Sequence, residues 1–312
     1  MMKIYFLETQ YHYMGWNDVF LELVNNLKEK YNAEVIHQKG GHLYIEKFDY
    51  NMPDCELIIH DEENDILKSI TWSESPTNIF DIYKQRNNEK DILLLTQQAY
   101  WFPKDYDFSV YNFTVKPTTF YTFTPQTCHD HFYNLRKFKN FDSLIDQMFC
   151  LFTTRREDPF RLREMGLSNT SPGILSIDDY LKGAINFKVG LSLSSLAEVC
   201  YRDIEYMAVG LPMMRLEYMT PFDPPLIPNY HYISIPRDGF DWSTESDRRG
   251  GEKYVEAYKN RFLEVKDDEQ FLNFITKNAR EYYTTYCSPQ NRVTHIMNRL
   301  EINPTLSDGF NI

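Results

Sequence analysis

Short apolar runs alternate with helical stripes and polar loops along most of this chain, and that alternation restricts the fold more than any other feature. The strand-like runs of the first part are residues 4–7, 33–37, 55–60 and 92–96. A helix capped by Asn17 or Asp18 is predicted up to residue 31. Its apolar stripe consists of Phe20, Leu21, Val24 and Leu27. Run 55–60 is mainly apolar, so we expect it in a parallel sheet covered on both faces. This spacing predicts a Rossmann-like half.

The pattern starts again near residue 145. A helix is predicted at 141–147, followed by strand-like runs at residues 148–152, 187–193, 213–216 and 232–235. The later predicted helices are residues 159–165, 176–185 with Ser176 as its cap, 202–209, 267–286 and 289–300. A chain of 312 residues exceeds what one core usually holds.

We therefore predict an α/β fold of two Rossmann-like domains that face each other across a cleft. The first domain is expected at residues 1–145 and the second at 146–288. Residues 289–312 are predicted to form a C-terminal helix and tail, for which packing back on the first domain is one option. In such folds the carboxyl ends of the strands border the ligand site.

Charge and hydropathy narrow the class of partner and the compartment. The formal net charge is −12, and an acidic surface repels phosphate backbones, so nucleic acid is not expected as the main partner. The first residues do not resemble a secretory leader, and no run of about 18 apolar residues exists, so we expect no membrane span. The sequence predicts a cytoplasmic protein.

The cysteines predict neither a disulfide framework nor a zinc site. The chain has five of them, an odd number, and none forms a C-x-x-C pair. We expect small buried or half-buried side chains at these positions. They are Cys55, Cys128, Cys150, Cys200 and Cys287.

Residues 196–216 carry the most chemical information. They spell a loop, a helix with Arg202 and Glu205 in its first turns, Gly-Leu-Pro, and a buried strand. A helix start offers free N–H groups and a partial positive charge, to which Arg202 can add a bidentate clamp on phosphate. The carboxylate of Glu205 can accept hydrogen bonds from both hydroxyls of a ribose. These features suit a nucleoside diphosphate.

The pattern Arg202-x-x-Glu205-x-x-Ala208-x-Gly210-x-Pro212 resembles the donor-site signature of GT-B glycosyltransferases. Residues 228–236 resemble the stretch that follows in exostosin-like and related sugar transferases, and the likeness covers roughly residues 148–300. The resemblance implies a nucleotide-sugar donor bound by the second domain, with Glu205 on the ribose and Arg202 near the diphosphate. The other residues that we assign to this donor site are Arg155, Arg156, Tyr201, His231 and Tyr232. The base stays open, with UDP as the working choice.

Two departures from that family pattern bear on the mechanism. Retaining members often have two glutamates with seven residues between them, whereas Glu198 and Glu205 have six between them. We therefore expect an inverting enzyme. The glycine-rich loop of the first domain is reduced to Gly15.

An inverting transferase needs a general base near the acceptor hydroxyl. We expect it from the first domain, with His12, Asp18 and Asp61 as candidates. Asp18 also suits a helix cap, and Asp61 begins a run of acids that also suits a solvated loop. An acceptor sugar could stack on aromatic side chains of this domain, for which core packing is an equal alternative. These are Tyr11, Tyr13, Trp16 and Trp101.

Each donor-site residue has a plainer alternative. Arg202 and Glu205 could form a solvated pair on an ordinary amphipathic helix. Arg155 and Arg156 could pair with the acids that follow them, and His231 could be structural. The basic loop that contains Arg248 and Arg249 could close over phosphates or remain a solvated loop.

No metal or cofactor is required by this interpretation, and Mg²⁺ or Mn²⁺ is not expected. Asp105 and Asp107 spell D-x-D, but their flanks indicate a turn. His129 and His131 have no further metal-ligand partner nearby in sequence, which favours a surface turn.

The signatures of kinases, simple dehydrogenases, zinc proteases and α/β-hydrolases are absent. The predicted function is a glycosyltransferase that uses a nucleoside diphosphate sugar and a glycan or other hydroxyl acceptor. The alternatives are a GT-B-shaped epimerase or phosphorylase and a two-lobed small-molecule binding module. The sequence does not determine the oligomeric state.

Overall fold

The structure, a computed structural model, describes slightly more than half of the chain, in two compact units. Unit 1 comprises Met1–Thr122, Thr220–Asp223 and Gln290–Ile312, and unit 2 comprises Phe123–Met219 and Pro224–Pro289. The described residues are 2–8, 21, 24–29, 32–39, 43–45, 48–50, 55–61, 66–73, 91–96, 115–118, 140–152, 157–169, 171–172, 176–193, 201–218, 222, 224–238, 251–288, 291, 294 and 298.

Unit 1 is built on a mixed sheet with the strand order β2-β1-β5-β6-β7-β8. These strands are β1 (Met2–Glu8), β2 (Glu34–Lys39), β5 (Cys55–Asp61), β6 (Ile66–Ser73), β7 (Asp91–Thr96) and β8 (Val115–Thr118). A separate antiparallel pair is formed by β3 (Leu43–Ile45) and β4 (Phe48–Tyr50). The predicted strands at 4–7, 33–37, 55–60 and 92–96 are confirmed as β1, β2, β5 and β7.

The direction of β5 differs from the prediction. This strand is antiparallel to both neighbours, β1 and β6, while the pairs β1–β2, β6–β7 and β7–β8 are parallel. An apolar run reports burial on both faces, and it does not report which way the strand runs. The prediction that residues 55–60 lie in a wholly parallel sheet is therefore wrong.

The helical residues between β1 and β2 confirm half of the predicted apolar stripe. Val24 and Leu27 are buried with Ile4 and Phe6 of β1. Leu21, which we expected on the same stripe, is 42% exposed. Leu21 is three residues before Val24 and six before Leu27, so it lies to one side of the buried pair, at the edge of the apolar face.

Unit 2 contains a parallel four-stranded sheet with the order β14-β13-β12-β9. Its strands, with the short parallel pair β10–β11, are β9 (Ile145–Phe149), β10 (Leu151–Phe152), β11 (Ser171–Pro172), β12 (Phe187–Leu191), β13 (Met213–Leu216) and β14 (Ile233–Ile235). The helical elements are η4 (Phe141–Ser143), α4 (Asp158–Glu164), α5 (Ile177–Ala184), α6 (Tyr201–Val209), α8 (Glu252–Val265), α9 (Glu269–Tyr282) and the π-helical turn η5 (Tyr283–Cys287).

The strand order of unit 2 contains a reversal at β9. Met148 of β9 pairs with Val189 of β12 and also forms a parallel bridge with Ser168, so β9 has a neighbour on each side. β10 continues from β9 after one residue and pairs with β11. The chain thus moves from β9 and β10 outward to β11, then to the opposite side for β12, β13 and β14. This is the doubly wound order 2-1-3-4-5, with its switch point between β9 and β12.

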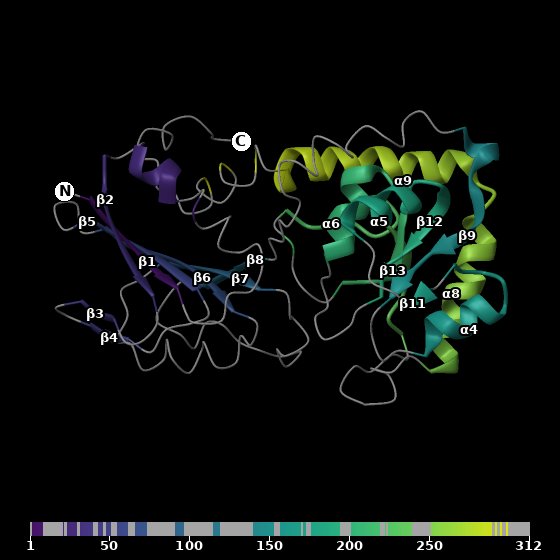
Figure 1. Ribbon diagram of the computed structural model, residues 1–312, viewed down its shortest axis with the longest axis horizontal. Helices are drawn as coiled ribbons and strands as arrows, with labels where there is room; N and C mark the ends of the chain where they lie inside the picture. Colours follow the sequence, from purple (N-terminus) through teal and green to yellow (C-terminus); the bar gives the residue numbers. More distant parts are fainter. Residues whose placement is uncertain are drawn as a thin grey trace. The chain divides into compact units, whose positions relative to one another are not determined.

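Helices cover both sides of this sheet. α4 packs against α8, whereas α5 and α9 both pack against α6, and Figure 1 shows these two groups on different sides of the strands. Val189, Met214 and Ile233 form one buried cluster with Tyr258 and Phe262 of α8. Unit 2 is therefore a Rossmann-like α/β layer structure, as the sequence predicts.

Local signals define several helix ends as predicted. The Ser176 hydroxyl accepts a hydrogen bond from the Asp179 amide and caps α5, and proline occupies the first turn of α4. Gly210 has φ +75° and ends α6, a conformation that favours glycine. Two expectations fail: residues 145–147 are strand rather than helix, and α8 was not predicted at all.

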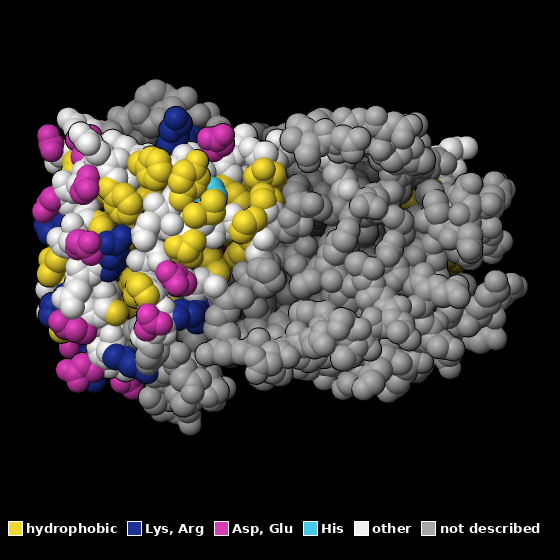
Figure 2. All heavy atoms as spheres, turned by 180° about the vertical axis from the view of Figure 1, so that it is seen from behind, with side chains coloured by type: hydrophobic (Ala, Val, Ile, Leu, Met, Phe, Trp, Pro, Cys, Tyr) yellow, Lys and Arg dark blue, Asp and Glu magenta, His cyan; other side chains and the backbone are white. Residues whose placement is uncertain are grey.

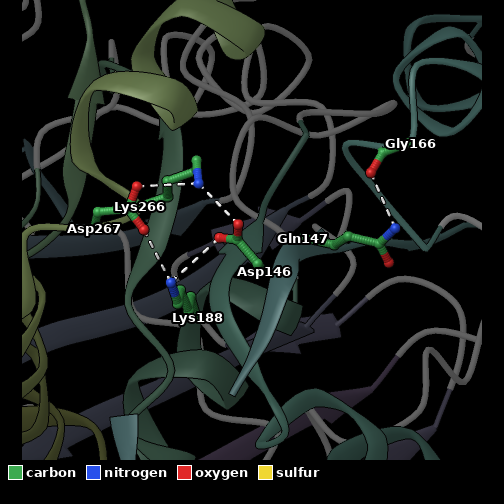
Figure 3. A network of polar contacts seen from close by, with 6 residues as sticks. All are labelled: Asp146, Gln147, Gly166, Lys188, Lys266 and Asp267. Carbon is green, nitrogen blue, oxygen red and sulfur yellow. Dashed lines mark hydrogen bonds and ion pairs between the residues drawn. The ribbon is translucent and has the colours of Figure 1, made fainter. Parts of the chain in front are cut away.

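A charged network fastens the turn between α8 and α9 to the amino ends of β9 and β12 (Figure 3). Lys188 of β12 lies 3.3 Å from an Asp146 oxygen and 3.1 Å from an Asp267 oxygen. Lys266 bridges the same two acids at 2.8 and 3.1 Å. This network lies at the amino edge of the sheet, away from the edge where α/β proteins bind ligands.

Candidate functional site

The switch point of unit 2 is where a ligand site is expected in a doubly wound sheet. Two chain segments leave it from neighbouring strands: residue 153 onward follows β10, and Ser192 onward follows β12. The second segment leads to α6, which returns along the sheet to β13. The first turn of α6 therefore lies at the carboxyl edge of the sheet, beside the switch point.

A buried ion pair fixes that first turn. Asp203 of α6 and Arg215 of β13 are 0% and 1% exposed, and Arg215 Nη1 lies 2.5 Å from Asp203 Oδ2. Ser192, directly after β12, donates a short hydrogen bond to the other oxygen of Asp203. The guanidinium also donates to the Leu216 carbonyl at 3.1 Å and stacks on Tyr218, with its carbon 3.4 Å from the ring centre. Strand ends and helix start are thus joined by one satisfied polar cluster.

The pair is not among the sequence-based predictions. The sequence does contain a signal for it: Arg215 is a charged residue inside the strand Met213–Leu216, whose remaining residues are apolar. A buried arginine requires a partner. Only the fold could show that the partner is Asp203 rather than a nearer acid.

Arg202 and Glu205, the centre of the predicted donor site, are both half-buried. They are therefore not the fully solvated pair of the plainer alternative. Burial raises the pKa of Glu205 to about 7; the Arg202 charge opposes this shift and the Asp203 charge adds to it. A carboxyl group that titrates near neutrality at a sheet's carboxyl edge is a candidate for a functional role.

Tyrosine side chains of α5 and α6 adjoin Glu205. Tyr180 and Tyr206 are stacked, with ring centres 6.4 Å apart, and Phe149 packs against both. Burial also raises the pKa of each tyrosine. Tyr201 is the first residue of α6, so its backbone lies at the predicted position, and its side chain lies outside the described part of the structure.

Further polar groups lie at the carboxyl ends of β13 and β14. Glu217 accepts a hydrogen bond from the Ser234 hydroxyl at 2.8 Å, and Arg237 Nε donates to the Glu217 carbonyl. Arg237 brings a further guanidinium, besides those of Arg202 and Arg215, to this edge of the sheet. Arg237 is not among the predicted site residues, although its place two residues after a predicted strand is a usable signal.

His231 and Tyr232 precede β14 and so lie before its amino end. The Nδ1 atom of His231 accepts a hydrogen bond from the Ile227 amide at 2.8 Å, and burial lowers the pKa of this imidazole to about 4. Tyr232 is buried and packs edge-to-face on Tyr218 at 5.2 Å. The described contacts of both residues are structural, and their predicted contact with a donor stays a prediction.

Beside His231, Tyr230 and Phe274 are 41% and 45% exposed and pack edge to face at 5.3 Å. Figure 2 shows hydrophobic side chains gathered on one face of the described part of unit 2. Such a face is unusual only when it is large and continuous.

The remaining candidates fall largely outside the described residues. Arg155 and Arg156 follow β10 in the sequence but are outside that part, as are His12 and Asp18. Asp61 ends β5 opposite Met2 and Ile66, the first residues of β1 and β6. It therefore lies at the opposite edge from the carboxyl ends of β1 and β6, because β5 runs the other way. Asp61 is a candidate base because it ends a strand, and this reason fails because the end of β5 lies at the opposite edge of the sheet.

The metal, cysteine and membrane expectations can be compared only with the described residues. Among these, no group of three or more His, Cys, Asp or Glu side chains could hold a metal ion. The D-x-D and His-Asp-His segments, and Arg248 and Arg249, lie outside them. Cys150 and Cys287 are buried free thiols, and burial raises the pKa of Cys287 to about 12. None of the described helices has the length and apolar character needed to cross a membrane.

Comparison with known proteins gives little beyond this geometry. No protein-family model matches the chain, and no curated protein matches it significantly in sequence. Among solved structures, the chain is similar to WaaG, described as a glycosyltransferase involved in lipopolysaccharide biosynthesis, at 11% identity and a TM-score of 0.41. The alignment covers 97% of this chain and 98% of that one. A likeness at this level supports no conclusion about this chain's chemistry.

Proposed function

We propose that this chain is a glycosyltransferase that moves a sugar from a nucleoside diphosphate sugar to the hydroxyl group of a glycan or small acceptor. One observation carries the proposal. The helix with the donor-site-like pattern begins at the carboxyl edge of a doubly wound sheet, beside its switch point, and its Arg202 and Glu205 are half-buried there. The sequence resemblance and the position in the fold are independent arguments for the same segment.

In the proposed complex, Arg202 and the free N–H groups at the start of α6 receive the diphosphate. When the bond between the sugar and the diphosphate breaks, negative charge grows on the departing phosphate oxygen. A fixed guanidinium stabilises this charge without moving, so a metal ion is not required in this proposal. The rigid Asp203–Arg215 pair supports the mechanism by keeping the helix start in place.

Glu205 is proposed to accept hydrogen bonds from the ribose hydroxyls. Only the ionised carboxylate can accept at both oxygens from two donors. Because burial raises the pKa of Glu205 to about 7, nucleotide affinity should increase as the pH rises from 6 to 8.

We further propose inversion at the sugar carbon. The acceptor oxygen attacks from the face opposite the diphosphate while a base takes its proton. The base is proposed to be His12 or Asp18 of the N-terminal half, and the strand direction of β5 removes the argument for Asp61.

The first experiment is a thermal-shift screen of the full chain with UDP, GDP, ADP, CMP and dTDP, each with and without Mg²⁺. A ligand that binds only the native state raises the melting temperature. One diphosphate should raise it clearly, and Arg202→Ala and Glu205→Ala should each reduce that rise. Lys259→Ala, a substitution on the exposed face of α8, is the matched control and should keep it.

Activity then separates an enzyme from a binding module. A transferase should slowly release free nucleoside diphosphate from its donor even without acceptor, whereas a binding module should not. No melting shift with any of the five nucleotides would remove the basis of the proposal and favour the two-lobed binding module.

A further inference from the structure

A hollow of about 430 Å³ lies over the last turns of α9 and the π-helical turn η5. Its volume is within the range of small-molecule sites, which is about 300–1,000 Å³. π-helical turns are rare and occur frequently at functional sites. We refer to this feature as the α9 hollow, and the described residues that line it are Lys277, Arg280, Glu281, Thr284 and Thr285.

The charges around the α9 hollow favour an anionic ligand. Two cations and one acid line it, so it has a local surplus of positive charge on a chain whose formal net charge is −12. The carboxyl end of α9 adds a partial negative charge of about half a unit, which is smaller than that surplus. Lys277 and Glu281 are one turn apart, and within the described part of the chain neither forms an ion pair. Both charges therefore remain available to a ligand.

Packing holds the Arg280 side chain at this position. It lies against Gly210, where an added Cβ atom would come within 2.9 Å of Arg280 Cδ and 3.2 Å of its Nη1. A guanidinium that is fixed in advance loses less rotamer freedom when it binds a phosphate group. Gly210 follows the last residue of α6, a helix of 9 residues that spans about 13 Å. The α9 hollow is therefore separate from the predicted donor site at the first turn of α6.

The two threonines of η5 add hydrogen-bonding groups of different kinds. The Thr284 hydroxyl donates to the Arg280 carbonyl at 2.8 Å, so a ligand can bond to this oxygen only as a donor. The Thr285 hydroxyl makes no hydrogen bond among the described residues, and it can donate or accept. With the Glu281 carboxylate, the α9 hollow thus offers acceptors for hydroxyl groups beside its two cationic donors. A ligand that uses both sets has an anionic group and hydroxyl groups.

We propose that the α9 hollow binds a small phosphorylated sugar, whose phosphate contacts Lys277 and Arg280 and whose hydroxyl groups donate to Glu281 and Thr285. Arginine binds phosphate through two parallel N–H groups, and lysine binds it as a point charge. The Glu281 carboxylate repels an anion but accepts from a hydroxyl group, so it favours a phosphorylated sugar over inorganic phosphate. This site lies outside the proposed nucleotide site and does not depend on the proposed function.

The test is calorimetric titration of the full chain with glucose 6-phosphate, inorganic phosphate and unphosphorylated glucose. Glucose 6-phosphate should bind most tightly, and glucose should not bind, because the cations supply most of the attraction. Lys277→Gln and Arg280→Gln should each weaken the binding of glucose 6-phosphate about tenfold, since each removes a hydrogen bond to a charged group. Added NaCl should weaken it as well, because it screens exposed charges.

Two further variants identify the ligand and the place where it binds. Glu281→Ala removes a negative charge, so it should strengthen the binding of inorganic phosphate about threefold. It also removes an acceptor, so the preference for glucose 6-phosphate over inorganic phosphate should fall. Lys259→Gln, which removes a lysine from α8, is the matched control and should leave every affinity unchanged. Melting curves check that each variant remains folded.

Three outcomes would overturn the proposal, whether or not the chain binds a nucleoside diphosphate. The first is that glucose 6-phosphate does not bind, or binds as well to Lys277→Gln and Arg280→Gln as to the unchanged protein. The second is equal affinity for glucose 6-phosphate and inorganic phosphate, which would leave no role for the hydroxyl acceptors. The third is an equal loss with Lys259→Gln and Lys277→Gln, which would indicate attraction by overall charge rather than by the α9 hollow.

Discussion

The two carboxyl groups of α6, Asp203 and Glu205, are close in sequence and have opposite surroundings. Asp203 is fully buried, and both its oxygens are bonded, one to Arg215 and one to Ser192. Glu205 is half-buried, and burial raises its pKa to about 7 despite the Arg202 charge. The satisfied carboxylate holds the helix against the sheet. The half-buried carboxyl group, with its raised pKa, is the candidate for contact with a ligand.

The largest effect should come from breaking the satisfied pair. Asp203→Ala leaves the Arg215 guanidinium buried without its partner, which should lower the free energy of unfolding by about 3–5 kcal/mol. Urea unfolding followed by circular dichroism measures it. The double variant Asp203→Val with Arg215→Met removes both charges and should be less destabilised than Asp203→Ala. If Asp203→Ala cost less than about 1 kcal/mol, the pair would not anchor α6.

A second variant moves α6 without touching either carboxyl group. A Cβ atom at Gly190 of β12 would lie 2.6 Å from Leu211 and 2.7 Å from the Tyr206 ring. Gly190→Ala should therefore cost about 1–3 kcal/mol through overpacking. Gly183→Ala in α5 is the matched control, because its Cβ would meet only Phe149 at 3.6 Å, an ordinary contact. That change should be neutral or stabilise by about 0.5–1 kcal/mol; equal losses at both glycines would contradict tight packing of α6 on β12.

Glu205→Gln tests the half-buried carboxyl group through the pH dependence of stability. Its folded-state pKa of about 7 is raised above the unfolded value, so the native state binds the proton more tightly. The protonated Glu205 side chain therefore stabilises the folded state at low pH, and this stabilisation is lost as the pH rises from about 4.5 through 7. Glutamine cannot ionise and avoids this loss. The melting temperature of Glu205→Gln relative to the unchanged protein should increase between pH 5 and pH 8, and a constant difference would show that Glu205 titrates normally.

The smallest effect is expected where charges are paired in solvent. Lys266 lies 2.8 Å from Asp146 in the network of Figure 3, and the two carboxylates of this network, Asp146 and Asp267, are 50% and 70% exposed to water. Lys266→Gln should cost about 0.5 kcal/mol, and the cost should shrink in 1 M NaCl as the charges are screened. Unfolding at two salt concentrations measures this. If Lys266→Gln lowered the free energy of unfolding as much as Asp203→Ala does, burial would not explain the difference between the two ion pairs.

Local sequence signals predicted much of unit 2. Ser176, Gly210 and the strand 213–216 were placed correctly because capping, positive φ and short apolar runs are properties of a few neighbouring residues. α8 was missed although Tyr254, Tyr258 and Phe262 repeat at four-residue intervals, a helical signal that charged neighbours obscured. The sequence predicts helix at residues 145–147, where the structure has strand, because the polar residues there conceal a sheet position.

The sequence alone predicts only part of the candidate site. The segment with Arg202 and Glu205 was identified from its pattern and from the glycine and proline that end its helix. Tyr180, Asp203 and Arg215 were not identified as partners, since their contacts join elements that are separated by loops and strands. No local rule reports which acid a buried arginine selects.

The sequence by itself determined the alternation of helices and strands, the start and end of α6, and the residue types available to grip a diphosphate. The tertiary structure alone decided that β5 runs against its neighbours, that the strand order of unit 2 reverses at β9, and that Asp203 rather than Glu205 is paired with a buried arginine. The physical reason is the range of the interactions. Capping and periodicity act within a few residues, whereas strand direction and buried charge pairing depend on which distant surfaces exclude water together.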